Sequence, residues 1–207
     1  APIRGPVGAE TALRGTSQNL AGRWRVVELD DIINSHDAAL RSNPEFPPRY
    51  QRRNLSSDAQ KMKVEAISGA RFDPARLGDA PEVQGGAPTM GPDRIAEAGR
   101  GRGIAIRRAY ERDPSGKGAA YRAGVIKTAP GLGIDPAAVE GMRRPGLVRE
   151  RTTPLDEAAR LKFIREADAP TTGGFGAGEA ARSDAAAMTD TTVKAIQPGD
   201  VNSAANR

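Results

Sequence analysis

The sequence predicts an α+β fold in which helices outnumber strands. Helical spacing and helix-capping residues recur along the chain, whereas segments of strand character are short. The 24 glycines and 16 prolines exceed average usage and predict many turns. Because only 38% of the 207 residues are apolar and 4% are aromatic, we expect one domain with tails and a thin core.

The first half of the chain begins with a segment that has no apolar period. Residues 1–22 are rich in Gly, Pro and Thr, so we expect an irregular N-terminal arm. The β-branched run from Trp24 to Leu29 predicts a strand. Prolines exclude a helix from residues 43–48, which we assign to a loop. A capping box and a following glycine predict a helix over residues 57–68.

The middle of the chain combines a hairpin with a glycine-rich turn. Residues 88–98 form two short runs around Gly91-Pro92-Asp93, which predicts a β-hairpin. The segment Gly99-Arg100-Gly101-Arg102-Gly103, which we call the elbow, then leads into a helix over residues 104–111. A second helix is expected over residues 121–127.

The last third alternates helices with one strand. Asp135 and Pro136 start a short helix that ends near Met142, and residues 147–149 predict a strand. A Thr153 cap and Pro154 at the first position open another helix. Residues 179–188 favour a helix as well. We therefore expect a domain over residues 23–196, with a helical C-terminal part over 153–196, and a polar tail over 197–207.

Composition excludes several classes of protein. Without cysteine there is no disulfide framework, thiolate zinc site or catalytic thiol, and one histidine excludes a His-rich metal site. No apolar run is long enough to span a bilayer, and the N-terminus lacks the apolar stretch of a signal peptide. The net charge of +5 and the pI near 9.9 favour polyanionic partners or reflect a nonspecific basic surface.

The elbow is the most informative motif for function. Glycines allow a sharp turn and close approach to a ligand, and a helix N-terminus presents unpaired N–H groups. Arg100 and Arg102 would add bidentate donors for phosphate oxygens. The pattern is neither a Walker A motif nor a dinucleotide fingerprint. It indicates either a phosphate or nucleic-acid backbone site, or simply a tight strand–helix turn on a basic surface.

A second basic cluster lies at Arg49-Tyr50-Gln51-Arg52-Arg53. Its arginines and its aromatic ring would suit a base or a phosphate, and we name Arg49, Arg52 and Arg53 as candidate DNA contacts. The alternative is a solvated loop in which Tyr50 packs in the core.

Two further segments carry reactive residue types. Ser35-His36-Asp37 contains the letters of a catalytic triad, but we expect adjacent side chains to point apart, so we predict no relay and name no catalytic residue. Glu166-Ala167-Asp168 offers carboxylates, which are either solvated or available to a metal.

The order of these motifs is similar to that of the ParB/sulfiredoxin-like superfamily, and specifically to the DdrB-like ParB domain of phages and mobile elements. The resemblance is carried by Ser35-His36, residues 43–47, the elbow with Ala105-Ile106-Arg107-Arg108, and residues 142–149 and 163–168. It extends over about residues 24–200.

The resemblance implies a compact domain with a short mixed sheet, several helices and irregular terminal arms. Relatives bind CTP or ATP phosphates at the glycine-rich turn, so nucleotide with Mg²⁺ is the implied cofactor. By position, Gly99, Gly101 and Arg102 match the phosphate turn, and Gln51, Arg53 and Glu166 match flanking segments, with Arg100 completing the candidate phosphate site. The DdrB-like branch occurs in large phage proteins linked to anti-restriction, some of which travel in the virion.

Three departures from the family pattern bear on activity. Arg100 and Asp168 each replace an asparagine, and Arg52 replaces a proline. A carboxylate at position 168 repels a triphosphate unless a cation pairs with it. We hypothesise an Arg100–Asp168 salt bridge that fills a degenerate nucleotide site, and we do not expect catalysis.

Two functions agree with these observations. The first is a virion- or DNA-associated accessory protein, whose partners are other virion proteins, copies of itself or DNA, located in the virion or host cytoplasm and not at a membrane. The second is a CTP-dependent DNA-binding protein or ParB-like nuclease. A sulfiredoxin-like reductase is excluded because the chain has no cysteine.

Overall fold

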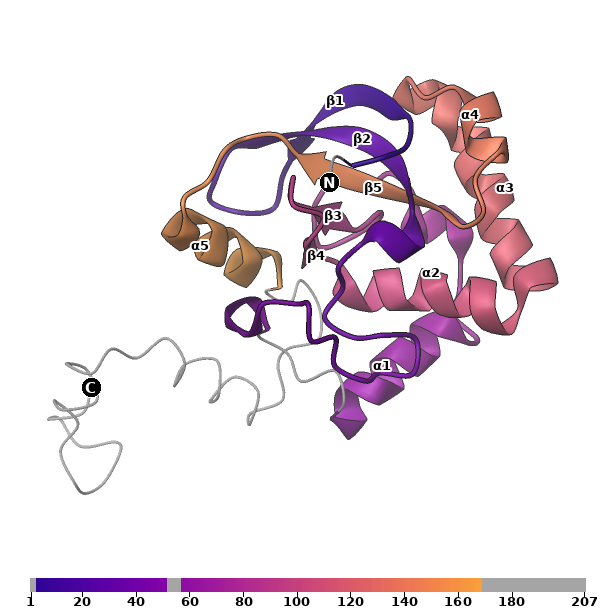
Figure 1. Cartoon of the computed structure of the whole chain (residues 1–207), viewed down its shortest axis with the longest axis horizontal. Coiled ribbons are helices and arrows are strands. Elements are labelled where there is room, and N and C mark those ends of the chain that lie inside the picture. The colour runs from indigo at the N-terminus through magenta and orange to yellow at the C-terminus, as the bar shows by residue number, and fades with distance from the viewer. Residues whose placement is uncertain (1–2, 52–56, 169–207) are drawn as a thin grey trace, which may run out of the picture. The chain divides into compact units, whose positions relative to one another are not determined.

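The computed structural model describes residues 3–51 and 57–168, and it contains one mixed sheet surrounded by helices (Figure 1). The strand order is β1-β2-β5-β3-β4; β3 and β5 are parallel, and the other pairs are antiparallel. The strands are β1 (Val7–Leu13), β2 (Leu20–Glu28), β3 (Thr89–Met90), β4 (Ala96–Ala98) and β5 (Pro145–Arg151). The predicted α+β class with a short mixed sheet is confirmed.

The N-terminal segment corrects the expectation of an irregular arm over residues 1–22. Val7–Leu13 forms the edge strand β1, which pairs with β2 through a register that places Glu10 opposite Arg23 and Leu13 opposite Leu20. Most of β1 is exposed and only Leu13 is fully buried. An exposed edge strand of small and polar residues has no apolar alternation, so its partner strand determines its conformation.

Five α-helices were expected over the described residues and all five are present. They are α1 (Asp58–Ser68), α2 (Arg100–Arg112), α3 (Ala119–Thr128), α4 (Pro136–Glu140) and α5 (Glu157–Ala167). Asp135 caps α4 as predicted, since its carboxylate accepts a hydrogen bond from Ala137 N at 3.0 Å. The predicted hairpin over residues 88–98 is confirmed as β3 and β4.

The start of α5 differs from the sequence-based expectation. Asp156, and not Thr153, caps the helix: its carboxylate accepts from Ala159 N at 2.8 Å. The Thr153 hydroxyl instead accepts from Ala21 N in β2 at 2.8 Å. The Thr153 side chain, which local sequence predicts to cap α5, therefore makes a tertiary hydrogen bond to β2 instead.

Two apolar clusters hold the helices against the sheet. One joins Val26 and Leu147 to Ile106 of α2 and Tyr121 of α3. The other contains Phe163 and Ile164 of α5, each fully buried. In Figure 1, α5 lies at the left and α3 and α4 at the right, with strands between them.

Three segments meet at the elbow: β4, the segment that contains Tyr50, and the end of α5. Among the described residues, no helix has the length and apolar character needed to cross a membrane. The expected helix over 179–188 and the tail over 197–207 lie outside the described residues.

Candidate functional site

The elbow begins with a left-handed glycine. Gly99 follows β4 with φ 72° and ψ 26°, a conformation that disfavours L side chains. A Cβ atom at this position would come within 2.5 Å of Arg102 Nη2. Helix α2 starts at Arg100, four residues earlier than expected, so both elbow arginines belong to its first turn and not to a loop before it.

Gly103, at the end of the first turn of α2, lies where a side chain would clash with the loop at Asn34. A Cβ atom there would meet Asn34 Nδ2 at 2.9 Å, because the Asn34 amide donates to Arg100 O at 3.1 Å. Glycine normally costs about 1 kcal/mol in a helix interior. Here the missing side chain lets the 34–36 loop pack directly on the helix.

Arg100 is buried and fully engaged. Its guanidinium forms an ion pair with Asp168, at the end of α5, and Nη1 donates to Tyr50 O at 2.7 Å. The side chains of Arg100 and Asp168 are 3% and 8% exposed. The Arg100–Asp168 salt bridge hypothesised from sequence is confirmed, although the two residues lie 68 positions apart.

The Arg102 side chain lies beside Gly99 and reaches the 80–87 loop. Its Nη1 and Nη2 atoms donate to Gly86 O at 3.0 Å and to Val83 O at 2.8 Å. Burial, together with the charge of Arg149, lowers the pKa of Arg102 to about 9, while the charge of Asp168 opposes this shift. This guanidinium binds carbonyl oxygens of the 80–87 loop.

Sequence reasoning missed Arg149 of β5. It is 1% exposed and donates to Glu82 O at 3.1 Å and to Ala87 O at 2.8 Å, and it lies 5.9 Å from the Trp24 ring centre. Burial lowers its pKa to about 10. The available signal was an arginine next to the apolar pair Leu147-Val148 within a predicted strand.

The sequence of the elbow and its surroundings matches one family model. The ddrB-like ParB superfamily domain matches residues 15–152, which is most of the chain.

The chain belongs to the ddrB-like ParB superfamily.

The match runs from the β1–β2 turn through the end of β5 and stops before α5. A search of curated proteins and a search of solved structures each returned no match.

The second basic cluster of this ParB-like domain is only partly described. Arg49 is 62% exposed, forms an ion pair with Glu157 and lies 5.0 Å from the Tyr50 ring centre. Gln51 is half-buried next to the Tyr50 carbonyl that binds Arg100. Arg52 and Arg53 lie outside the described residues, so the DNA contacts stay a prediction.

Glu166 binds the β1–β2 turn. Its carboxylate accepts from Ser17 N at 2.7 Å and from Ser17 Oγ at 2.6 Å. These hydrogen bonds lower the pKa of Glu166, against the effect of burial. The Glu166 carboxylate is thus held at the β1–β2 turn, whereas Asp168, two residues later, makes the ion pair with Arg100 of the elbow.

The Ser35-His36-Asp37 segment of the domain forms no three-residue relay. His36 Nδ1 does lie 3.1 Å from Ser35 Oγ, which corrects the expectation that adjacent side chains point apart. Asp37 instead binds Arg41 and Ala39 N. Burial lowers the pKa of His36, as does the charge of Arg100, while Asp37 opposes both. The pKa of His36 thus lies below its ordinary value, which favours the neutral ring.

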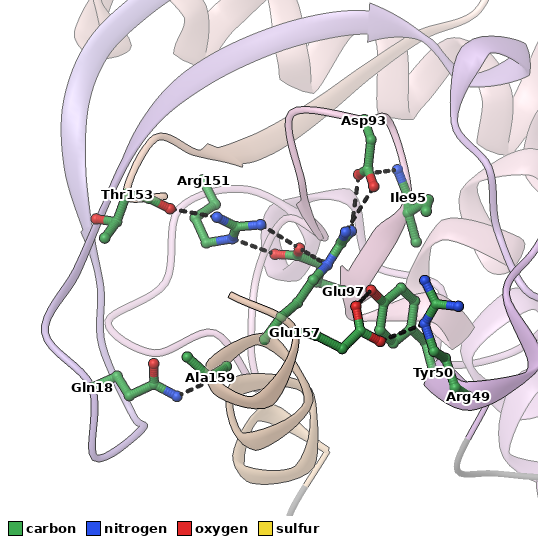
Figure 2. A network of polar contacts seen from close by, with 11 residues as sticks. Gln18, Arg49, Tyr50, Asp93, Ile95, Glu97, Arg151, Thr153, Glu157 and Ala159 are labelled. Atoms are coloured by element: carbon green, nitrogen blue, oxygen red, sulfur yellow. Dashed lines mark hydrogen bonds and ion pairs between the residues drawn. The ribbon is translucent and has the colours of Figure 1, made fainter. Parts of the chain in front are cut away.

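A polar network fastens the N-terminal half of α5 to the domain (Figure 2). Fully buried Glu97 accepts from Arg151 at 2.8 and 2.9 Å and pairs with Arg160 Nε at 2.7 Å. Arg160 also binds Asp93, at the β3–β4 turn. The Tyr50 hydroxyl donates to Glu157 at 2.9 Å. The network therefore joins α5 to β4, β5 and the loop whose carbonyl holds Arg100.

A hollow on the described surface lies away from the elbow arginines. An open groove of about 690 Å³ is formed by the β1–β2 hairpin, residues 10–16 and 18–21. None of the elbow arginines lines it. This groove is therefore separate from the anion site that the elbow motif predicts.

The elbow in this conformation does not fit an external triphosphate. The Arg100 guanidinium is already ion-paired with Asp168, and the Asp168 carboxylate repels phosphate oxygens. Arg102 already donates to two loop carbonyls. Among the described residues, no three His, Asp or Glu side chains are grouped so that they could hold a metal ion.

Proposed function

We propose that the chain is a phage-derived ParB-like accessory or structural module of a virion or of DNA, with a closed nucleotide site and no nucleotide turnover. Membership of the ddrB-like ParB superfamily supports the ParB-like part. The link to phage, virion and anti-restriction rests on the resemblance described above.

One observation carries the proposal of a closed site. The buried Arg100–Asp168 ion pair places a carboxylate at the helix N-terminus where relatives hold phosphate. Breaking a buried pair on one side typically costs about 3–5 kcal/mol. A nucleotide phosphate would have to displace Asp168 before it could bind the Arg100 guanidinium, so the existing ion pair lowers its affinity.

The direct test is calorimetry of the full chain with CTP and with ATP, each with Mg²⁺, followed by a hydrolysis assay. We expect no binding at micromolar concentrations and no release of phosphate. Micromolar affinity, lost in Arg102→Ala, would contradict the closed site and would place a functional nucleotide site at the elbow.

The alternative is a CTP-dependent DNA-binding protein or ParB-like nuclease. Exposed Arg49 and the net charge of +5 favour it. It requires DNA affinity to change when CTP is added, whereas an accessory protein with a closed site binds DNA equally with and without CTP.

A further inference from the structure

The two edges of the sheet differ in how the described chain covers them. An uncovered edge presents unpaired N–H and C=O groups to any strand that approaches it. At the β4 edge, Ala96 N donates to Ile33 O at 3.0 Å, so a neighbouring segment closes the ladder. At the β1 edge, a bulge interrupts the register between Val7 and Glu10, and the strand is regular over residues 10–13. This regular stretch, which we call the free edge, has no strand on its outer side among the described residues.

The backbone groups of Ala12 point outward from the free edge. Its register partner in β2 is Ala21. Ala21 N donates to Thr153 Oγ1 at 2.8 Å, and Ala21 O accepts from Thr152 N at 3.0 Å, so both groups face the β5 side of β2. Residue pairs in an antiparallel ladder alternate between hydrogen-bonded and non-hydrogen-bonded, and Ala12–Ala21 is therefore of the second kind. The N–H and C=O of Ala12 consequently face away from β2.

Two opposite charges flank Ala12 at equal spacing along the chain. Glu10, Ala12 and Arg14 are all exposed, whereas the Leu13 side chain is buried on the opposite face. In the described part of the chain, the side chains of Glu10 and Arg14 take part in no hydrogen bond or ion pair. The open groove of about 690 Å³ is lined by the free edge and the β1–β2 turn. The free edge therefore has space beside it and unpaired charges of both signs.

The free edge is complementary to itself. In an antiparallel pair centred on Ala12, this residue donates one hydrogen bond to Ala12 of a second copy and accepts one from it. The same register places Glu10 across from Arg14 of the second copy, and twofold symmetry repeats this contact. Arg14 O already accepts from Val83 N at 3.0 Å, so the ladder ends at this residue. Moving the centre by one residue in either direction removes the match of charges, so the charges select a single register.

We propose that two copies of the chain associate through the free edge, so that their sheets join across a twofold axis at Ala12. The occupant of the groove beside β1 is then the same strand of the second copy. The pairing adds few hydrogen bonds, so the dimer forms at high protein concentration and dissociates on dilution. This interface goes beyond the proposed function and does not depend on the closed site at the elbow.

The experiment measures the association of the full chain by sedimentation equilibrium over a series of protein concentrations. Glu10→Arg and Arg14→Glu should each weaken self-association at least about tenfold, a difference of about 1.4 kcal/mol, because each places like charges opposite one another twice. An equimolar mixture of the two variants should associate as well as the unaltered chain, because every cross-strand pair is again of opposite charge. Exposed Glu140 of α4 supplies the control: Glu140→Arg makes the same change in net charge and should leave association unchanged.

A proline at the centre of the free edge tests the backbone contact. Ala12→Pro removes the outward N–H and leaves the hydrogen bonds between β1 and β2 in place, so it should abolish association while the chain stays folded. An unaltered chain that stays monomeric at every concentration overturns the proposal. So does a mixture of Glu10→Arg and Arg14→Glu that associates no better than either variant alone. None of these measurements involves nucleotide or DNA, so failure here is distinct from failure of the proposed function.

Discussion

Gly99 shows how a single residue sets the geometry of the elbow. Its φ of 72° turns the chain from β4 into α2, and the absent Cβ leaves room for the Arg102 guanidinium. Gly101, two residues later, has room for a methyl group: a Cβ atom there would make an ordinary van der Waals contact with Val64 Cγ2 at 3.8 Å. The two glycines therefore differ in both backbone conformation and space.

Alanine substitutions should separate these roles. Gly99→Ala is expected to destabilise the protein by about 1–2 kcal/mol or more, because alanine is strained in the left-handed region and clashes with Arg102. Gly101→Ala should stabilise by about 0.5–1 kcal/mol, because it removes helix-interior glycine without a clash. Urea unfolding of both variants is the measurement, and equal shifts of the same sign would refute the assigned conformation.

At the scale of elements, α5 is fastened by two kinds of ion pair. Glu97 is fully buried between Arg151 and Arg160, whereas the Asp93 side chain is 42% exposed. Both carboxylates contact the same Arg160. Buried pairs are costly to break on one side, while exposed pairs contribute little.

Neutralising each carboxylate tests this difference. Glu97→Gln should lower the free energy of unfolding by about 3–5 kcal/mol, because it leaves a buried arginine charge without its partner. Asp93→Asn should cost no more than about 1 kcal/mol. Chemical denaturation of both variants provides the comparison; similar losses would show that Glu97 is not the anchor of α5.

For the whole molecule, the net charge of +5 overstates the charge available to a partner. Several arginines are buried and engaged inside the domain, among them Arg25, Arg100, Arg108, Arg149 and Arg151. Of the predicted DNA contacts, Arg49 is exposed and pairs with Glu157. DNA affinity should therefore depend on a few surface arginines and not on the bulk composition.

Gel retardation of a DNA duplex at two salt concentrations tests this expectation. The triple variant of Arg49, Arg52 and Arg53 to alanine should weaken binding and reduce the slope of log K against log salt by about 2–3, roughly 0.9 per lost phosphate contact. The control replaces exposed Arg71, Arg76 and Arg112 and removes equal charge. Equal losses would indicate nonspecific attraction, and a change in affinity with CTP would favour the alternative function.

Local sequence was sufficient for much of the fold and for part of the site. The hairpin at 88–98, the glycine after it and the five helices depend on turn residues, caps and periodicity within a few positions, so they were predictable. The Arg100–Asp168 pair was predictable because both residues depart from the family pattern together.

Tertiary structure alone decided the remaining features. Strand β1 forms because β2 is available to pair with it. The Thr153 hydroxyl accepts a hydrogen bond from β2 and does not cap α5. Arg102 and Arg149 donate hydrogen bonds to carbonyl oxygens of the 80–87 loop, which is distant from Arg149 in sequence. Neighbouring residues specify backbone conformation. The segment that packs against a buried charge or an unpaired strand edge supplies its partner, and that segment is set by the tertiary fold.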